Sequence, residues 1–226
     1  MIERFRLVTA NVRNADPATF KDLIGRLNAD LVAVQELAPR QAAALAEVLP
    51  FGHLRPTPSG RGMGIALRKP GSVTPVPLPF RGGWSAEVVP VGASREPLEI
   101  VNVHIVAPIR LPPWRTLAIR RAQLRALLTY LDGNPRRRRV LLGDLNSTPL
   151  WPAYRVLLRR FEDAAVEAAR REGRRAPRTW RLSSRLPCLL RIDHVLTSGL
   201  AAYQVRALPI LGSDHCAVVI DLATVD

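Results

Sequence analysis

Short apolar segments that each end at a polar residue recur along this chain. An apolar run of this length is typical of a buried strand. Strand ends meet at one rim of a sheet, where a rigid scaffold can hold a group of functional side chains. The pattern therefore predicts a sheet-based fold with a site at one rim. The polar residues concerned are Asn11, Glu36, His104, Asp144, Asp193, Asp214 and His215.

Helix signals alternate with these strands. Asp16 is suited to cap a helix that begins at Pro17 and runs through Leu27, and Pro39 opens a second helix. Leucines at helical spacing predict a long helix over 117–131. We expect strands at 5–11, 31–35, 62–67, 86–91, 98–104, 140–142, 192–197 and 216–222, and another helix at 154–158. The alternation predicts an α/β fold.

Length and composition favour one domain. A chain of 226 residues with 47% hydrophobic content can bury a sizeable core, so we expect a single domain over 1–226, present as a monomer. The sequence has no apolar run of membrane-spanning length and no signal region, which predicts a cytoplasmic protein or a trimmed domain of an exported or anchored one. Cys188 and Cys216 are too few for a disulfide framework; free thiols are favoured, and a bridge stays open.

The charge of the chain indicates its partners. Lys and Arg number 33 against 19 Asp and Glu, a formal net charge of +14. Such an excess attracts polyanions, so nucleic acid or an anionic membrane surface is the expected partner. In the arginine-rich stretch 170–181, Arg178 and Arg181 flank Trp180 and are predicted to contact a phosphate backbone and a stacked base. The alternative is a solvated helix end.

Two other segments also contain arginines. The proline-rich stretch 108–114 contains Arg110 and Trp114, which could shape a substrate lip, or Trp114 and Leu111 could anchor the chain at a membrane interface. The block 136–139 precedes a strand and is interpreted as a solvated turn at the opposite rim.

The segment 143–146 (GDLN) is the most specific local pattern. Asp144 and Asn146 alternate along the chain, so both can face one side and together orient a water molecule and contact a phosphate oxygen. In the segment 213–215 (SDH), His215 can act as a general base near neutral pH. Each segment could also be a plain turn whose side chains cap backbone amides.

The remaining polar residues have two interpretations each. Glu36 is a suitable ligand for a hard cation, because Mg²⁺ takes one or two carboxylates, but it could also open the following helix. Asp193 needs a partner if it is buried, and an active-site imidazole would serve. Asn11 could be a turn residue, and His104 could be a core histidine.

Taken in order, these segments resemble the endonuclease/exonuclease/phosphatase superfamily, which includes pancreatic-type DNases, abasic-site endonucleases, neutral sphingomyelinases and inositol polyphosphate phosphatases. The resemblance covers almost the whole chain. It implies a four-layered α/β/β/α sandwich of two mainly antiparallel sheets flanked by helices, with the site between the sheets. The segments are 9–11 (TAN), 35–36 (QE), 102–104 (NVH), 143–146 (GDLN), 191–193 (RID) and 213–215 (SDH).

The resemblance also implies roles. Asn11, Glu36 and Asp214 match positions at the site of a Mg²⁺ or Mn²⁺ ion. Asp144 matches the residue that orients the attacking water, and Asn146 one that contacts the phosphate. His215 matches the catalytic histidine, held by Asp193, while His104 matches a second histidine beside the scissile phosphate.

The histidine at position 104 separates branches of the superfamily. Abasic-site enzymes usually have a tyrosine there, so the chain resembles the DNase, sphingomyelinase and phosphatase branches more closely. Glu87 is the candidate partner of His104 by sequence position. The extended hallmarks of the inositol phosphatases are not found around Asn146 or Asp193.

These observations predict a divalent-metal-dependent phosphodiester hydrolase that attacks with an in-line water molecule. The charge favours a nuclease that cleaves DNA, with RNA as a further substrate. A phospholipid or sphingomyelin phosphodiesterase, or a phosphatase of the same superfamily, is the first alternative. The second is a non-catalytic module that binds nucleic acid, against which the retained metal and water residues argue.

Overall fold

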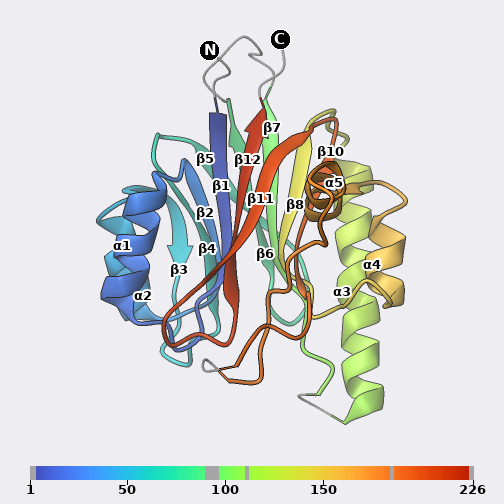
Figure 1. Ribbon diagram of the computed structural model, residues 1–226. Coiled ribbons are helices and arrows are strands. Elements are labelled where there is room, and N and C mark those ends of the chain that lie inside the picture. The colour runs from blue at the N-terminus through green and yellow to red at the C-terminus, as the bar shows by residue number, and fades with distance from the viewer. Residues whose placement is uncertain (1–3, 90–96, 110–111, 184–185, 224–226) are drawn as a thin grey trace.

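Two six-stranded sheets pack face to face with helices on their outer sides, as predicted (Figure 1). The structure is a computed structural model that describes residues 4–89, 97–109, 112–183 and 186–223. The first sheet has the order β11-β12-β1-β2-β4-β3 and the second β5-β6-β7-β8-β10-β9. The first contains β1 (Arg4–Asn11), β2 (Leu31–Leu37), β3 (Phe51–Arg55), β4 (Gly62–Leu67), β11 (Ala202–Pro209) and β12 (Cys216–Ala223).

The second sheet contains β5 (Ser72–Val76), β6 (Gly83–Val88), β7 (Leu98–His104), β8 (Arg139–Asp144), β9 (Glu162–Asp163) and β10 (Asp193–Ser198). Both sheets are mainly antiparallel, but β1 and β2 pair in parallel, as do β7 and β8. A parallel pair needs a crossover connection, and a helix supplies it in both cases. These helices are α1 (Pro17–Leu27) and α3 (Pro113–Gly133).

The helices cover the two outer faces. Helices α1 and α2 (Pro39–Ala46) lie beside the first sheet, and α3 and α4 (Pro152–Leu157) beside the second (Figure 1). Helix α5 (Ala164–Arg171) packs against β10 and β11, so it joins the two sheets at one side. One apolar cluster fills the space between the sheets, and one lies under each outer helical layer. None of the described helices is both long and apolar enough to cross a membrane.

Local signals explain why several elements match their prediction. Helix α1 begins and ends where expected, and the Asp16 carboxylate accepts a hydrogen bond from the Thr19 amide over 2.9 Å. Helix α3 is longer than predicted, because it already begins at Pro113 in the proline-rich stretch. The edge strands β3 and β5 were not predicted, since both are five residues long and mostly exposed and therefore have no apolar alternation.

The structure corrects the interpretation of one arginine-rich block. The block 136–139 is not wholly a solvated turn, because Arg138 and Arg139 are buried and Arg139 begins β8. The Arg139 guanidinium forms an ion pair with the buried carboxylate of Glu99 on the neighbouring strand β7. A buried cation needs such an anionic partner. The sequence of an arginine run does not indicate which arginine is buried with one.

Candidate active site

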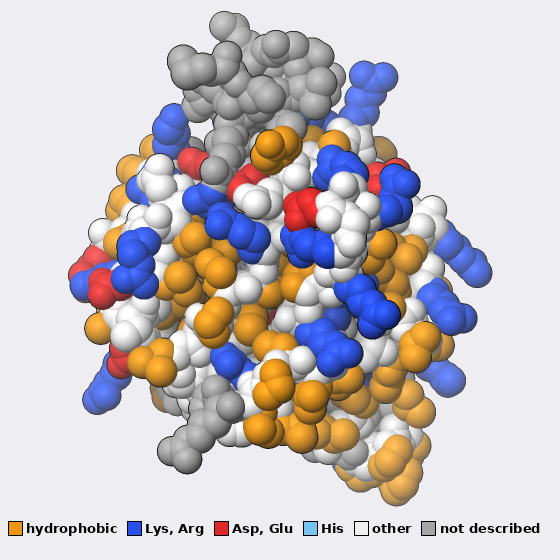
Figure 2. Space-filling model, in the orientation of Figure 1, with side chains coloured by type: hydrophobic (Ala, Val, Ile, Leu, Met, Phe, Trp, Pro, Cys, Tyr) orange, Lys and Arg blue, Asp and Glu red, His pale blue; other side chains and the backbone are white. Residues whose placement is uncertain are grey.

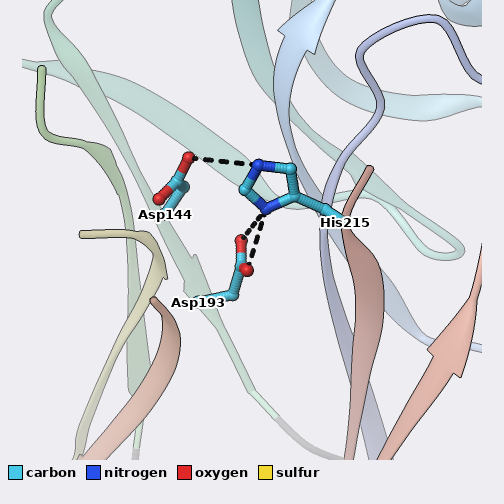
Figure 3. Close-up of side chains that lie close together, drawn as sticks. All are labelled: Asp144, Asp193 and His215. Carbon is cyan, nitrogen blue, oxygen red and sulfur yellow. Dashed lines mark hydrogen bonds and ion pairs between the residues drawn. The ribbon is translucent and has the colours of Figure 1, made fainter. Parts of the chain in front are cut away.

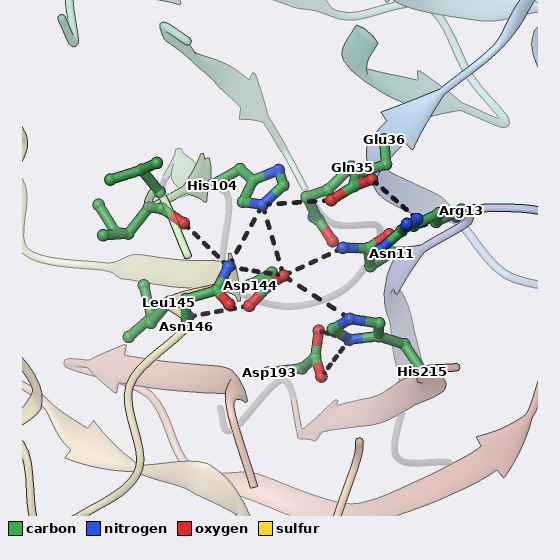
Figure 4. A network of polar contacts seen from close by, with 12 residues as sticks. Asn11, Arg13, Gln35, Glu36, His104, Asp144, Leu145, Asn146, Asp193 and His215 are labelled. Carbon is green, nitrogen blue, oxygen red and sulfur yellow. Dashed lines mark hydrogen bonds and ion pairs between the residues drawn. The ribbon is translucent and has the colours of Figure 1, made fainter. Parts of the chain in front are cut away.

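Strand register places three of the predicted residues side by side. In the second sheet, His104 of β7 lies opposite Asp144 of β8, and Asp193 of β10 lies opposite the same Asp144. Asn11 and Glu36 stand at the ends of β1 and β2 in the facing sheet, which packs against β8. The site therefore lies between the sheets at one rim, and Figure 4 shows the side chains converging there.

Asp144 is the centre of the polar network. Its side chain is almost fully buried and accepts hydrogen bonds from Asn11 Nδ2 over 3.0 Å and from the Asn146 amide over 2.8 Å. The Asn146 side chain donates to it as well, over 3.1 Å. His104 Nε2 and His215 Nε2 lie 3.4 and 3.9 Å from its Oδ2 atom. Five polar contacts thus define the position of one carboxylate.

His215 is held in a fixed orientation. Its Nδ1 atom donates to Asp193, with 2.9 and 3.0 Å to the two carboxylate oxygens, so Nε2 faces Asp144 (Figure 3). The backbone amide of His215 donates to Ser213 Oγ over 3.1 Å, and that hydroxyl donates to the Asn11 carbonyl. These bonds tie the segment 213–215 to the end of β1.

The charges shift two pKa values in the site. Burial and the nearby charge of Asp193 raise the pKa of Asp144 to about 7, although its hydrogen bonds act in the other direction. Burial alone would lower the pKa of His215, but Asp193, Asp144 and Asp214 attract a proton to the ring and raise it to about 10. Near neutral pH the site therefore holds a protonated imidazole beside a carboxyl group that can gain or lose a proton.

Glu36 and Asn146 have unusual backbone conformations. Their φ values are +53° and +45°, in the left-handed region that residues other than glycine rarely adopt. Such strain concentrates at functional sites, where the surrounding structure enforces it. The Glu36 carboxylate lies 3.8 Å from His104 Nε2 and 3.9 Å from Arg13 Nε.

A pocket of about 250 Å³ opens beside this network. Its polar lining includes Glu36, Asp144, Asn146, Asp214 and His215. Its apolar lining includes Ile109, Trp151, Trp180 and Leu190. The indole of Trp180 donates to Asp214 Oδ2 over 3.2 Å, so the apolar and polar linings meet there.

The donor atoms suit a divalent cation. The carboxylates of Glu36, Asp144 and Asp214 line the pocket, and hard cations prefer such oxygen donors. Asp193 and His215 offer ligand atoms within 4.8 Å of Asp144 and of each other, but they are already paired with each other. A nearby cation would also offset the cost of burying Asp144, whose pKa is raised by desolvation and by the charge of Asp193.

All eight predicted catalytic and metal residues lie in this one region. They are Asn11, Glu36, His104, Asp144, Asn146, Asp193, Asp214 and His215.

The predicted substrate contacts lie in different places. Trp180 lines the pocket, whereas Arg178 is exposed outside it. Arg181 is 9% exposed and does not line the pocket, so it is poorly placed for a phosphate backbone. Trp114 is exposed in the first turn of α3, and Arg110 lies outside the described residues.

The proposed pairing of Glu87 with His104 is wrong. Glu87 sits near the far end of β6 and forms an ion pair with Arg136 over 2.8 Å. The residue against His104 is instead Arg81, whose Nη1 donates to the ring Nδ1 over 2.6 Å. Arg81 lies in the turn between β5 and β6, and its side chain is almost fully buried. Sequence reasoning missed it, because an arginine in a proline- and glycine-rich turn has no pattern of its own.

Two buried amides join the sheets beneath the site. Gln35 Nε2 donates to Asn102 Oδ1 over 2.7 Å, and Asn102 donates to the carbonyls of Val34 and Gly64. Gln35 and Asn102 belong to two of the segments that carry the family resemblance, but only the structure shows that they pair across the sheets. It holds the ends of β2 and β7 at a fixed separation.

The thiols of Cys188 and Cys216 are free and lie 3.1 Å apart. Cys216 directly follows His215, and its amide donates to the Thr179 carbonyl over 2.7 Å. The cysteine pair thus connects β12 to the segment that carries Trp180.

Comparison with known proteins defines the class. The profile of the endonuclease/exonuclease/phosphatase family matches residues 8–215. The chain therefore belongs to this family, whose members hydrolyse phosphoesters and depend on divalent metal. No curated protein sequence matches the chain significantly.

Solved structures of the same fold are similar over nearly their whole length. A humanized D. rerio TDP2 has a TM-score of 0.74 at 18% identity, covering 98% of this chain and 100% of that one. The human Nocturnin catalytic domain with bound sulfate has 0.73 at 17%, covering 98% and 93%. The Neisseria 3′ phosphatase NExo bound to product DNA hairpin has 0.71 at 20%, covering 96% and 99%. At these identities the likeness shows the fold.

Proposed function

We propose that this protein is a divalent-metal-dependent phosphodiesterase that acts as a nuclease on DNA. The observation that carries the proposal is the buried Asp144 carboxylate, which Asn11, Asn146, His104 and His215 surround at the pocket wall. Two similar structures support a nucleic-acid substrate, since one is a D. rerio TDP2 complexed with single-strand DNA product and the other is NExo bound to product DNA hairpin.

Glu36 and Asn11, with Asp214 nearby, would hold the metal, which is Mg²⁺ or Mn²⁺ in this proposal. When bound, such an ion polarises the phosphate and stabilises the negative charge that develops on its oxygens.

Asp144 aligns the attacking water and accepts its proton. A pKa of about 7 suits this task, because a general base works best when its pKa is near the working pH. The attack is in line with the leaving oxygen, and Asn146 Nδ2 exchanges its hydrogen bond to Asp144 for one to a phosphoryl oxygen. Asn146 is positioned for this by its bond to the Ile105 carbonyl over 2.9 Å.

His215 stabilises the negative charge on the phosphate. The ring is protonated at neutral pH, and Asp193 holds Nδ1, so Nε2 is free to donate towards the pocket. His104, whose ring is held by Arg81, stabilises the same charge from the other side of Asp144. The substrate enters past Arg13 and Trp180. The Arg13 guanidinium contacts the phosphate backbone, and the Trp180 ring stacks on a base.

The test is incubation of the parent protein with plasmid, linear and single-stranded DNA and with RNA, in Mg²⁺, Mn²⁺ or EDTA. We expect metal-dependent nicking that falls about 10²–10⁴-fold in Asp144→Asn and His215→Ala. Asp132→Asn is the matched control, because that carboxylate pairs with Arg160 on the surface. Near-parental nicking by Asp144→Asn would overturn the assignment. DNA binding without turnover would indicate the non-catalytic module.

A lipid phosphodiester is the second candidate substrate, because the pocket has an apolar wall of Ile109, Trp151 and Leu190. Such a wall suits acyl chains better than a phosphate backbone. Hydrolysis of sphingomyelin or phospholipid without plasmid nicking would favour this candidate over the nuclease.

A further inference from the structure

Large apolar side chains stand exposed around the mouth of the pocket. Figure 2 shows hydrophobic side chains gathered along the lower edge of the molecule, where Figure 1 places the loop before α3 and the loops before β10 and β12. Ile109 is 88% exposed, Leu150 78% and Trp114 72%. We call six such residues the apolar rim: Ile109, Trp114, Leu150, Leu182, Leu189 and Leu211.

The apolar rim is built from separate loops at the site end. Ile109 belongs to the β7–α3 connection and Trp114 to the first turn of α3, and Leu150 follows β8. The rim is continuous with the pocket, because Ile109 itself and Leu190, the neighbour of Leu189, line it. Exposed apolar groups that gather around a functional opening mark a binding surface, whereas single ones scattered elsewhere need no explanation.

The chemistry of the rim favours lipid over nucleic acid. Phosphates and base edges are bound by cationic and polar side chains, and bases stack on aromatic rings. Five of the six rim residues are instead aliphatic and provide neither contact. Aliphatic groups with a tryptophan beside them are what enters the headgroup and acyl boundary of a bilayer.

Charge complements this surface. Arg115 directly follows Trp114 and is exposed, and Arg13 lies at the pocket with 49% of its side chain exposed. Asp16, the exposed cap of α1, donates its amide to the Leu211 carbonyl and is an acidic group beside the rim. The chain as a whole carries +14, so a negatively charged surface attracts it before the apolar groups insert.

We infer that the apolar rim docks this protein onto an anionic lipid bilayer, with the pocket facing the headgroups. Docking needs no hydrolysis and does not depend on which phosphodiester is cleaved. Its failure and the failure of the proposed function are therefore separate outcomes. A docked protein would bring its pocket to headgroup phosphodiesters, so docking would strengthen the lipid candidate.

The experiment is co-sedimentation of the parent with vesicles of phosphatidylcholine alone or mixed with phosphatidylserine. We expect binding to the mixed vesicles and a blue shift of tryptophan fluorescence. The triple variant Ile109→Ser, Trp114→Ser, Leu182→Ser should bind at least about tenfold more weakly, because three large apolar groups no longer insert. All three side chains are exposed, so the variant should fold, which circular dichroism checks.

Tyr203→Ser is the matched control, since Tyr203 is 69% exposed on β11, outside the rim. Equal vesicle binding by the triple variant and the parent would overturn the inference. So would a loss of DNA binding with vesicle binding unchanged, which would assign the rim to nucleic acid. A concentration-dependent dimer that the triple variant abolishes would assign the rim to self-association and also overturn it.

Discussion

At the scale of single residues, Asp144 and His215 determine how the proposed activity depends on pH. Asp144 must be ionised to act as a base, so the rate should rise as pH increases through its pKa, which is about 7 without a bound cation and lower with one. His215 must be protonated to stabilise the phosphate, so the rate should fall as pH passes about 10. We expect a bell-shaped profile of kcat/KM, measured with a saturating fixed metal concentration.

The variant Asp193→Asn provides a sharper test of the same charges. It removes a negative charge that repels ionised Asp144 and attracts the proton of His215. Both limbs of the profile should therefore move to lower pH. If neither limb of the kcat/KM profile moves, Asp144 and His215 do not determine the pH dependence.

Asp163 makes a residue-scale prediction about stability. It is buried, accepts from Arg191 over 2.5 Å and from Tyr154 over 2.7 Å, and lies outside the proposed chemistry. Asp163→Asn should lower the free energy of unfolding by about 3–5 kcal/mol, because it leaves the Arg191 cation buried without its anion. Urea unfolding measures this, and Asp132→Asn on the surface should change it by less than about 1 kcal/mol.

The same carboxylate predicts loss of stability in acid. Burial would raise the pKa of Asp163, but His194 and Arg191 outweigh burial and hold that pKa well below its usual range. The stabilisation is therefore complete above about 4, the pKa of an unfolded aspartate, and is lost as pH falls below it. In Asp163→Asn, stability should fall less steeply over that acidic range.

At the scale of elements, Gly143 determines how closely β7 and β8 approach. Its φ is +130°, and a Cβ atom there would collide with the Val103 carbonyl of the paired strand. Gly143→Ala should cost at least about 1–3 kcal/mol of unfolding free energy and displace the adjacent Asp144. Gly133→Ala is the control, because a Cβ there meets nothing within 4 Å and should be neutral or slightly stabilising. Equal urea midpoints for the two variants would contradict this account.

The two cysteines predict a covalent link between elements. Burial and the contact with Cys188 raise the pKa of Cys216 to about 12, so the more exposed Cys188 should react first with oxidised glutathione. The mixed disulfide is then attacked by Cys216, which yields an internal bridge and two molecules of reduced glutathione. Mass spectrometry should show the loss of two hydrogens, and Cys188→Ser should not form the bridge. Persistence of both thiols in the parent would contradict the expectation.

At the scale of the whole molecule, net charge and chemistry should respond differently to salt. The +14 charge should make the affinity for DNA fall steeply with salt, because binding releases counterions. The hydrolysis rate of a small phosphodiester such as bis(p-nitrophenyl) phosphate should change little with salt, since this substrate contacts the pocket alone. A filter-binding series and a rate series in the same buffers compare the two. Equal salt dependence would mean that the charge acts mainly on the site itself.

Much of the architecture could be predicted from local patterns. The strand at 98–104 and the helix from Pro17 to Leu27 were found because apolar runs and capping residues are local signals. The edge strands β3 and β5 were not, since an exposed edge has no burial to impose a pattern. One domain over 1–226, the monomeric state and the resemblance to the DNase branch stay predictions.

The sequence by itself determined which residue types stand at the strand ends, because strand length and apolar spacing depend on residues that are neighbours in the chain. The tertiary structure alone decided which of them meet. Asn11 and Asp144 lie 133 positions apart and bond because β1 packs over β8. His104 rests on Arg81 and not Glu87, because the register of β6 on β7 puts Glu87 at the other end. Register and sheet packing depend on the whole core, which no local pattern encodes.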